Sequence, residues 1–423
     1  MKHLTCSMFV VAGLLVWGTS AWAQQEQWLQ YRTTADIYQS IGGSYGQKLS
    51  PQDEPPEGVA LPKLTGEKPV FLKWLPKIDE AALEKAKGGV WMVLDRTGKN
   101  GPYDRLYIDT NLDGSLAEET PIKADSAELD GDRHYATFRR VKVTLPGIDG
   151  PVAYHLEISY REYQQPALPP STEPGAMQRS ARATAAGWYE GEINVDGKKY
   201  WCMLIDNDAN GCFSDTSYNR ARCDVIRIGS KADRKFINDY ENDLTSRTVG
   251  QLVEVDGKLY SLKVADDGAS VTLAPASAVP MGSIRVPVNI SYFTVFGPMG
   301  HFLCKPINGL AAVPAGKYSL NRYEVAATDS AGVKWQIREF GSGYEKPFDV
   351  AEGKEYALDI GEPFKTELSA SRSNGEYRIN QSLRSRNGDF LNLRRDGKQP
   401  APPKVRIKSA DGSYDKTYTM EFG

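Results

Sequence analysis

The chain has 423 residues, a quarter of them charged, and its formal net charge is −3. This near balance of charge gives no strong positive electrostatic potential, so neither nucleic acid nor anionic lipid is expected as a partner. A chain of this length exceeds what one hydrophobic core usually supports, and about two to four domains are expected.

The N-terminus reads as an export signal covering residues 1–23. Lys2 begins a short polar start, residues 8–17 are apolar, and Ala21-Trp22-Ala23 has the small-x-small pattern of a signal-peptidase site. The alternative is a buried N-terminal helix. Cleavage before Gln24 leaves a net charge of −4 and places the mature chain in the periplasm or outside the cell. No later segment approaches about 18 uninterrupted apolar residues, so no membrane span is predicted in the mature chain.

Short alternating runs separated by glycine turns predict an all-β fold with minor α. Asp196-Gly197 and Asp256-Gly257 lie between alternating strands in two nearly repeated phrases, the strongest local signal for a hairpin. Residues 79–87 are one helical candidate. We expect tandem β-rich modules with strand-loop calcium sites, followed by a β-sandwich. The predicted divisions after the signal are an irregular leader at 24–60, a β-rich module at 61–165, a linker or long loop at 166–186, a β-rich module at 187–277, a sandwich-like domain at 280–362 and a C-terminal β-rich segment at 363–423.

Two copies of one motif carry the strongest chemical signal. Each is an apolar strand that runs directly into an acidic loop, at residues 106–114 and 203–211. A calcium loop uses side-chain oxygens at positions 1, 3 and 5, a turn glycine at 6 and a backbone carbonyl at 7. The residues at positions 1, 3, 5, 7 and 10 are Asp109, Asn111, Asp113, Ser115 and Glu118 in the first copy and Asp206, Asp208, Asn210, Cys212 and Asp215 in the second.

Both copies depart from the standard loop in the same way. Position 12, normally a bidentate Glu, is Thr120 or Ser217, whereas a carboxylate stands at position 10. This shared shift favours a shortened loop, and the preceding strands exclude helix-loop-helix EF-hands. The plain alternative is that Asp, Asn and Gly form Asx-turns without metal. We predict structural Ca²⁺ in both loops, with affinity near the extracellular class, about 10⁻⁴ to 10⁻³ M.

Other signals are weaker. Four cysteines follow the signal, and the spacing of Cys212 and Cys223 allows a disulfide, with buried free thiols as the alternative. Residues 42–46 match G-x-S-x-G around Ser44, but the polar flanks lack the strand and helix of a nucleophile elbow. The three remaining histidines lie far apart. No catalytic residue is therefore predicted, and the chain leans away from being an enzyme.

The phrases at residues 103–109 and 200–211 resemble those of uncharacterised exported bacterial β-rich proteins with embedded calcium loops, and residues 313–320 resemble a turn of transthyretin-like or Ig-like sandwiches. These resemblances imply no particular activity. The leading hypothesis is an exported, non-enzymatic, calcium-stabilised protein that binds or scaffolds at the cell envelope, with an unknown protein or glycan as partner. The alternatives are a carbohydrate-binding or carbohydrate-acting protein, and a hydrolase with an unrecognised active site.

Overall fold

The structure is a computed structural model that describes residues 25–422 except 43, 148–149, 165–176, 231–245, 341–345, 374–375 and 389. These residues are nearly all β, with the short helices α1 (Ile37–Ile41) and α2 (Glu80–Lys85) and the 3-10 turn η1 (Arg220–Arg222). The predicted all-β class with minor α is confirmed. No described helix combines the length and the hydropathy that crossing a bilayer requires. The predicted export signal lies outside the described residues.

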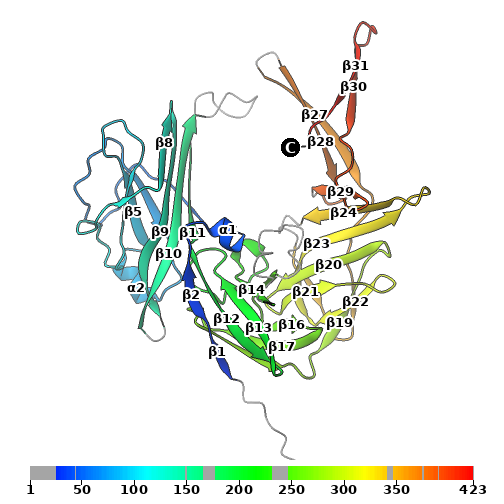
Figure 1. Cartoon of the computed structure of the whole chain (residues 1–423), viewed down its shortest axis with the longest axis horizontal. Helices are drawn as coiled ribbons and strands as arrows, with labels where there is room; N and C mark the ends of the chain where they lie inside the picture. Colours follow the sequence, from blue (N-terminus) through cyan, green and yellow to red (C-terminus); the bar gives the residue numbers. More distant parts are fainter. Residues whose placement is uncertain are drawn as a thin grey trace, which may run out of the picture.

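Four antiparallel sheets form the N-terminal two thirds of the described chain (Figure 1). One has the order β4-β5-β6-β7, from Val70–Trp74, Val90–Asp95, Arg105–Ile108 and Ile122–Lys123. The second has the order β3-β11-β10-β9-β8, from Gln47–Leu49, Met177–Ala185, Gly150–Gln164, Arg133–Gly147 and Ser126–Asp130. The third has the order β15-β14-β13-β12-β2, from Ser246–Thr248, Val225–Gly229, Lys198–Ile205, Gly187–Val195 and Gln30–Thr33. The fourth has the order β1-β18-β17-β16, from Glu26–Trp28, Ser270–Pro275, Lys258–Val264 and Leu252–Val255.

Two predicted divisions are corrected by this topology. The leader at 24–60 is not irregular throughout, because β1, β2 and β3 each pair with a strand far along the chain. Within the expected linker, residues 177–185 form strand β11 between β10 and β3. Small side chains explain the second error, since Ala181, Ala183 and Ala185 alternate with polar residues and point into the core. Residues 165–176 lie outside the described part.

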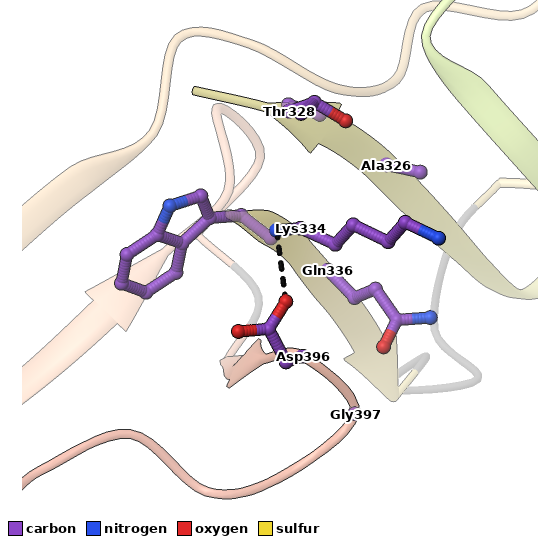
Figure 2. Close-up of a pocket in the computed structure, with 8 residues that line it drawn as sticks. Ala326, Thr328, Lys334, Gln336, Asp396 and Gly397 are labelled. Atoms are coloured by element: carbon purple, nitrogen blue, oxygen red, sulfur yellow. Dashed lines mark hydrogen bonds between the residues drawn. The ribbon is translucent and has the colours of Figure 1, made fainter. Parts of the chain in front are cut away.

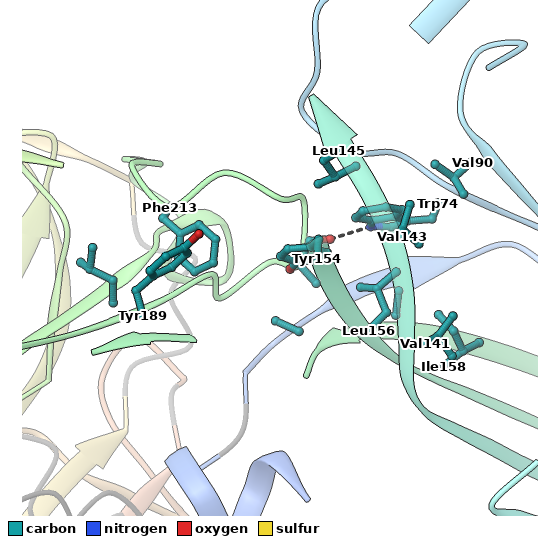
Figure 3. Close-up of a cluster of buried hydrophobic side chains, with 14 of the residues drawn as sticks. Trp74, Val90, Val141, Val143, Leu145, Tyr154, Leu156, Ile158, Tyr189 and Phe213 are labelled. Atoms are coloured by element: carbon teal, nitrogen blue, oxygen red, sulfur yellow. Dashed lines mark hydrogen bonds between the residues drawn. The ribbon is translucent and has the colours of Figure 1, made fainter. Parts of the chain in front are cut away.

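One hydrophobic core joins these sheets. It extends from Leu29 to Val271 and includes residues of both predicted β-rich modules. At its centre Trp74 and Tyr154 stack with ring centroids 5.6 Å apart, and Phe213 meets the edge of Tyr189 at 5.1 Å (Figure 3). The side chains in this figure come from three of the sheets, so the two modules pack as one body.

The two predicted Asp-Gly hairpins form and contact each other reciprocally. Lys198 and Tyr200 both bond to the Asp256 carboxylate, at 2.5 and 2.7 Å. Lys258 and Tyr260 bond to Asp196 at 3.2 and 2.7 Å. The repeated sequence phrase therefore encodes a local two-fold arrangement between the β12–β13 and β16–β17 turns.

The C-terminal third contains a sandwich and two projecting hairpins. The sandwich has a sheet of order β22-β19-β26 (Leu310–Pro314, Met281–Arg285, Glu355–Ala357) and a sheet of order β21-β20-β23-β24-β29 (Gly300–Cys304, Ile290–Gly297, Gly316–Thr328, Lys334–Phe340, Leu391–Arg395), with β25 (Phe348–Val350) paired to β23. Its own core includes Phe293, Val295, Tyr318 and Leu320. The hairpins are β27–β28 (Lys365–Ser373, Glu376–Arg384) and β30–β31 (Lys404–Lys408, Asp415–Thr419), each a two-stranded sheet.

Candidate functional site: two acidic loops

The two acidic loops, loop 1 (residues 109–120) and loop 2 (residues 206–217), have the same local fold. In each, the carboxylate at position 1 accepts hydrogen bonds from the backbone N–H groups at positions 5 and 6. Asp109 accepts from Asp113 at 3.1 Å and from Gly114 at 2.9 Å. The second carboxylate, Asp206, accepts from the corresponding N–H groups at 3.2 and 2.6 Å. Both loops therefore wrap around their first carboxylate.

The backbone conformations agree as well. Position 4 has a positive φ in both loops, 59° at Leu112 and 55° at Ala209, and the glycine at position 6 has φ of 78° or 85°. Glycine reaches this left-handed region without steric cost, which explains the turn residue seen in the sequence. Both loops also connect adjacent antiparallel strands, loop 1 from β6 to β7 and loop 2 from β13 to β14.

Loop 2 gathers three carboxylates in the protein interior. Asp206 and Asp224 are fully buried, and Asp208 is half-buried. One oxygen from each of these three residues lies within 4.8 Å of the others. Asp224 precedes β14 and was not predicted from the sequence. It is brought to the loop because β14 returns beside β13, with Val225 directly opposite Ile205.

A second group at the same place combines Cys212, Asp215 and Asp224. Lys77 contacts the Asp215 carboxylate, and its Nζ lies 3.5 Å from Cys212 Sγ. The Asp224 carboxylate accepts from the backbone N–H groups of Asn207 and Asp215, at 3.0 and 2.7 Å. Of the predicted second-loop ligands, Asp206 and Asp208 meet Asp224 in the first group, and Asp215 meets it in the second. Asn210 donates its amide N–H to Asp215 at 2.5 Å. Cys212 lies beside them through its side chain, whereas its backbone carbonyl was the predicted ligand.

Burial and mutual repulsion shape the acidity of this cluster. Desolvation raises the pKa of Asp206, and the neighbouring Asp208 carboxylate raises it further. The pKa of Asp224 is raised well above its usual range by burial and then by the charge of Asp206. Tyr154 donates its hydroxyl to Asp206 Oδ2 at 2.7 Å, whereas Asp208 Oδ1 is buried without a hydrogen-bond partner. The cluster thus concentrates negative charge that the surrounding hydrogen bonds satisfy only in part.

Loop 1 is less enclosed, and its side chains bond mainly to one another. Asp109 is buried, and burial raises its pKa. Asn111 donates to Asp113 at 3.0 Å, and Ser115 donates to Glu118 at 2.5 Å. Among the described residues, the groups of three acidic or thiol side chains close enough to share an ion are formed by loop 2 together with Asp224, and none includes a residue of loop 1. The predicted carboxylate ligands Asp109, Asp113 and Glu118 therefore lie in one loop without forming such a group.

Loop 2 also lies where the parts of the molecule meet. The Trp74 indole donates to Ala209 O at 2.6 Å, and the Lys77 N–H donates to Asn210 O at 2.7 Å. The chain that follows the loop contacts β23 of the C-terminal sandwich, where Ser319 donates to Tyr218 O at 2.9 Å. The loop therefore links the sheet containing β4 with the sheet containing β13, and the chain beyond it reaches the sandwich.

The predicted Cys212–Cys223 disulfide is not formed. Both residues are buried free thiols, as are Cys202 and Cys304. The Cys223 thiol points to the carbonyl of Ser217 at 3.2 Å, while Cys212 faces Ser214 at 3.3 Å. Chain spacing permitted the bridge, but the two side chains have separate partners.

The weak catalytic signals do not assemble. Ser44 lies after α1 and before β3, so it lacks the preceding strand and following helix of a nucleophile elbow. The buried His301 accepts a backbone N–H from Thr248 at 3.2 Å. A pocket of about 440 Å³ lies along β23 and β24 (Figure 2), where the Asp396 carboxylate already accepts the N–H of Lys334 at 3.1 Å. None of these places joins a nucleophile to a base.

Comparison of the chain with protein-family models, with curated proteins and with solved structures gives no match. The functional conclusion therefore rests on the geometry of the chain itself.

Proposed function

We propose that this protein is an exported, non-enzymatic binding or scaffolding protein whose fold is braced by Ca²⁺ at loop 2. Asp206, Asp208 and Asp224 would supply carboxylate oxygens, while Asp215 shares a second group with Asp224 and accepts the amide N–H of Asn210. The observation that carries this proposal is the convergence of three carboxylates, two of them fully buried, on one point.

The spacing fits a shared hard cation. Calcium binds oxygen at about 2.3–2.6 Å, so two oxygens on one ion lie no more than about 5 Å apart. The three carboxylate oxygens lie within 4.8 Å of one another. Burying like charges without compensation is costly. Lys77 supplies one positive charge through Asp215, and Asp208 Oδ1 keeps an unused acceptor.

The donor set favours calcium over zinc. Zinc sites commonly use thiolate or imidazole ligands. Burial raises the pKa of the Cys212 thiol to about 11, which keeps it protonated near neutral pH, and the other ligand atoms are oxygens. Magnesium prefers fewer protein ligands and retains more water than a site with this many side chains allows.

The position of the ion explains a bracing role. Loop 2 contacts β4, while the chain that follows it reaches β23 of the sandwich. Calcium would neutralise the cluster and fix the strand ends on either side of it, because binding to the native state alone stabilises that state. The weaker candidate, loop 1, shares this backbone geometry and would bind second. The protein as a whole would then present a stiff β-rich surface to a protein or glycan partner.

Thermal unfolding of the mature chain tests the proposal. The melting temperature should rise with millimolar Ca²⁺ and fall with EDTA, whereas equal Mg²⁺ should have a smaller effect. Asp206→Ala should abolish the response, and Asp109→Ala should leave most of it. A melting temperature that is the same in saturating Ca²⁺ and in EDTA would overturn the calcium brace.

A further inference from the structure

Two sheet edges at opposite ends of the molecule have matching patterns and opposite charges. The acidic edge is β8, Ser126–Asp130, whose one partner among the described strands is β9, at one end of a five-stranded sheet. The basic edge is β30, Lys404–Lys408, which within the described part of the chain pairs with β31 alone. Figure 1 places the two edges far apart, on separate arms of the molecule. We propose that the basic edge of one copy adds to the acidic edge of a second copy, so that the protein self-associates head to tail through strand pairing.

The sequence of each edge alternates between charged and apolar side chains. In β8, Glu128 and Asp130 are exposed and alternate with Ala127 and Leu129. Leu129 is 40% exposed although it is a large apolar residue on a strand. Uncovered strand edges carry unpaired backbone groups and are templates for a further strand.

The basic edge alternates in the same way, with basic side chains in place of the acidic ones. Lys404, Arg406 and Lys408 are exposed and alternate with the half-buried Val405 and Ile407. Arg406 already pairs with Asp415 on the neighbouring strand, at 2.7 and 2.6 Å, while the two lysines flank that pair. An isolated two-stranded hairpin is marginally stable in water, so a further strand would stabilise β30–β31.

One antiparallel register sets polar residues opposite polar ones and apolar residues opposite apolar ones at all five positions. With Glu128 opposite Arg406, Asp130 faces Lys404 and Ser126 faces Lys408. The same register sets Leu129 against Val405 and Ala127 against Ile407. Charged residues then lie on one face of the joined sheet and apolar residues on the other, as directly opposed residues do in an antiparallel pair.

Charge also selects the second copy as the partner of each edge. Charged edges commonly prevent aggregation, because like edges repel each other. Two acidic edges or two basic edges would repel each other, whereas an acidic and a basic edge attract. Attraction within the mixed pair and repulsion within the like pairs together make the acidic edge specific for the basic edge. The excess of basic residues extends beyond β30: residues 363–423 contain 12 basic and 7 acidic residues, although the mature chain as a whole is net acidic. Joining unlike edges is a heterologous contact, which yields rings or open chains of copies.

Sedimentation velocity of the full mature chain in Ca²⁺ tests the inference. The wild type should associate at tens of micromolar, and the association should weaken between about 0.05 and 0.5 M salt. Two variants, Glu128→Lys/Asp130→Lys and Lys404→Glu/Lys408→Glu, should each weaken association at least about tenfold. An equimolar mixture of the two variants should associate again, because the unchanged basic edge of the first variant then meets the unchanged acidic edge of the second.

A matched control reverses two exposed acids on another surface, Asp349→Lys/Glu352→Lys, and should associate like the wild type. Unchanged melting temperatures would show that the variants remain folded. A wild type that stays monomeric overturns the inference, as does association that the edge variants leave unchanged. Loss of association without recovery in the mixture also overturns it, since the charges would then act by another route.

Discussion

Asp208→Asn separates the ion site from the fold more cleanly than other changes in loop 2. The two side chains have the same shape, and Asp208 Oδ1 has no hydrogen-bond partner to lose. The substitution removes one of three converging negative charges. Two charges separated by 4.8 Å, the largest separation of these oxygens, repel by about 3.5 kcal/mol at an effective dielectric constant of about 20, and protons bound at the raised pKa values neutralise part of this charge. Without calcium, the variant should therefore be as stable as the wild type or up to about 2 kcal/mol more stable.

Calcium shifts this balance towards the wild type. With Kd near 10⁻⁴ to 10⁻³ M, about 10 mM Ca²⁺ stabilises the wild type by about 1.4–2.7 kcal/mol. This corresponds to about 3–10 °C for an unfolding unit of about 150–250 residues. Loss of one carboxylate charge should weaken binding about tenfold and reduce the calcium shift to about half or less.

Differential scanning calorimetry in EDTA and in Ca²⁺ measures both effects. The control Asp349→Asn changes an exposed carboxylate in β25 and should keep the full calcium shift. If Asp208→Asn lowered stability equally in EDTA and in Ca²⁺, the three carboxylates would not be sharing an ion, and the reasoning would be refuted.

Three further predictions concern the same loop. Gly211→Ala should lower the free energy of unfolding by about 2–4 kcal/mol, because φ is 85° and an added Cβ would lie 2.4 Å from Leu145. Gly197→Ala, where the added Cβ meets open space, should lower it by about 1 kcal/mol, and urea unfolding compares the two variants. Tyr154→Phe removes the hydroxyl that donates to buried Asp206 and should lower the free energy of unfolding in Ca²⁺ by about 1–3 kcal/mol, measured by urea unfolding. An unchanged free energy of unfolding would contradict this hydrogen bond. In EDTA, the free energy of unfolding should fall as pH rises from the ordinary carboxyl pKa near 4 towards the raised pKa values of the cluster. In this range the folded state holds protons that the unfolded state has released. Saturating Ca²⁺ should remove this pH dependence, and melting curves across the range test it.

Local signals in the sequence predicted local structure well. The helix start at Asp79 forms as expected, with its carboxylate accepting the N–H of Ala82 at 2.8 Å. Both Asp-Gly hairpins form, and both acidic loops share the backbone geometry that their spacing implied. Each of these features is set by contacts between residues close in sequence.

Features that depend on distant pairing were missed. Asp224 joins the site because β14 returns beside β13, and the only sequence signal was an acidic residue directly before an apolar strand. The sequence of β11 predicts a linker because its buried residues are alanines, which give little hydropathy contrast. The N-terminal strands pair with partners up to 246 residues away, Glu26 with Thr272, and no local pattern encodes that distance.

Anomalous scattering from crystals of residues 24–423 grown in millimolar Ca²⁺ gives the most direct test of the calcium site. A calcium peak is expected among the carboxylates of Asp206, Asp208 and Asp224, with oxygen distances of about 2.3–2.6 Å. A map with no peak at this position, in crystals where loop 2 is well ordered, would contradict it.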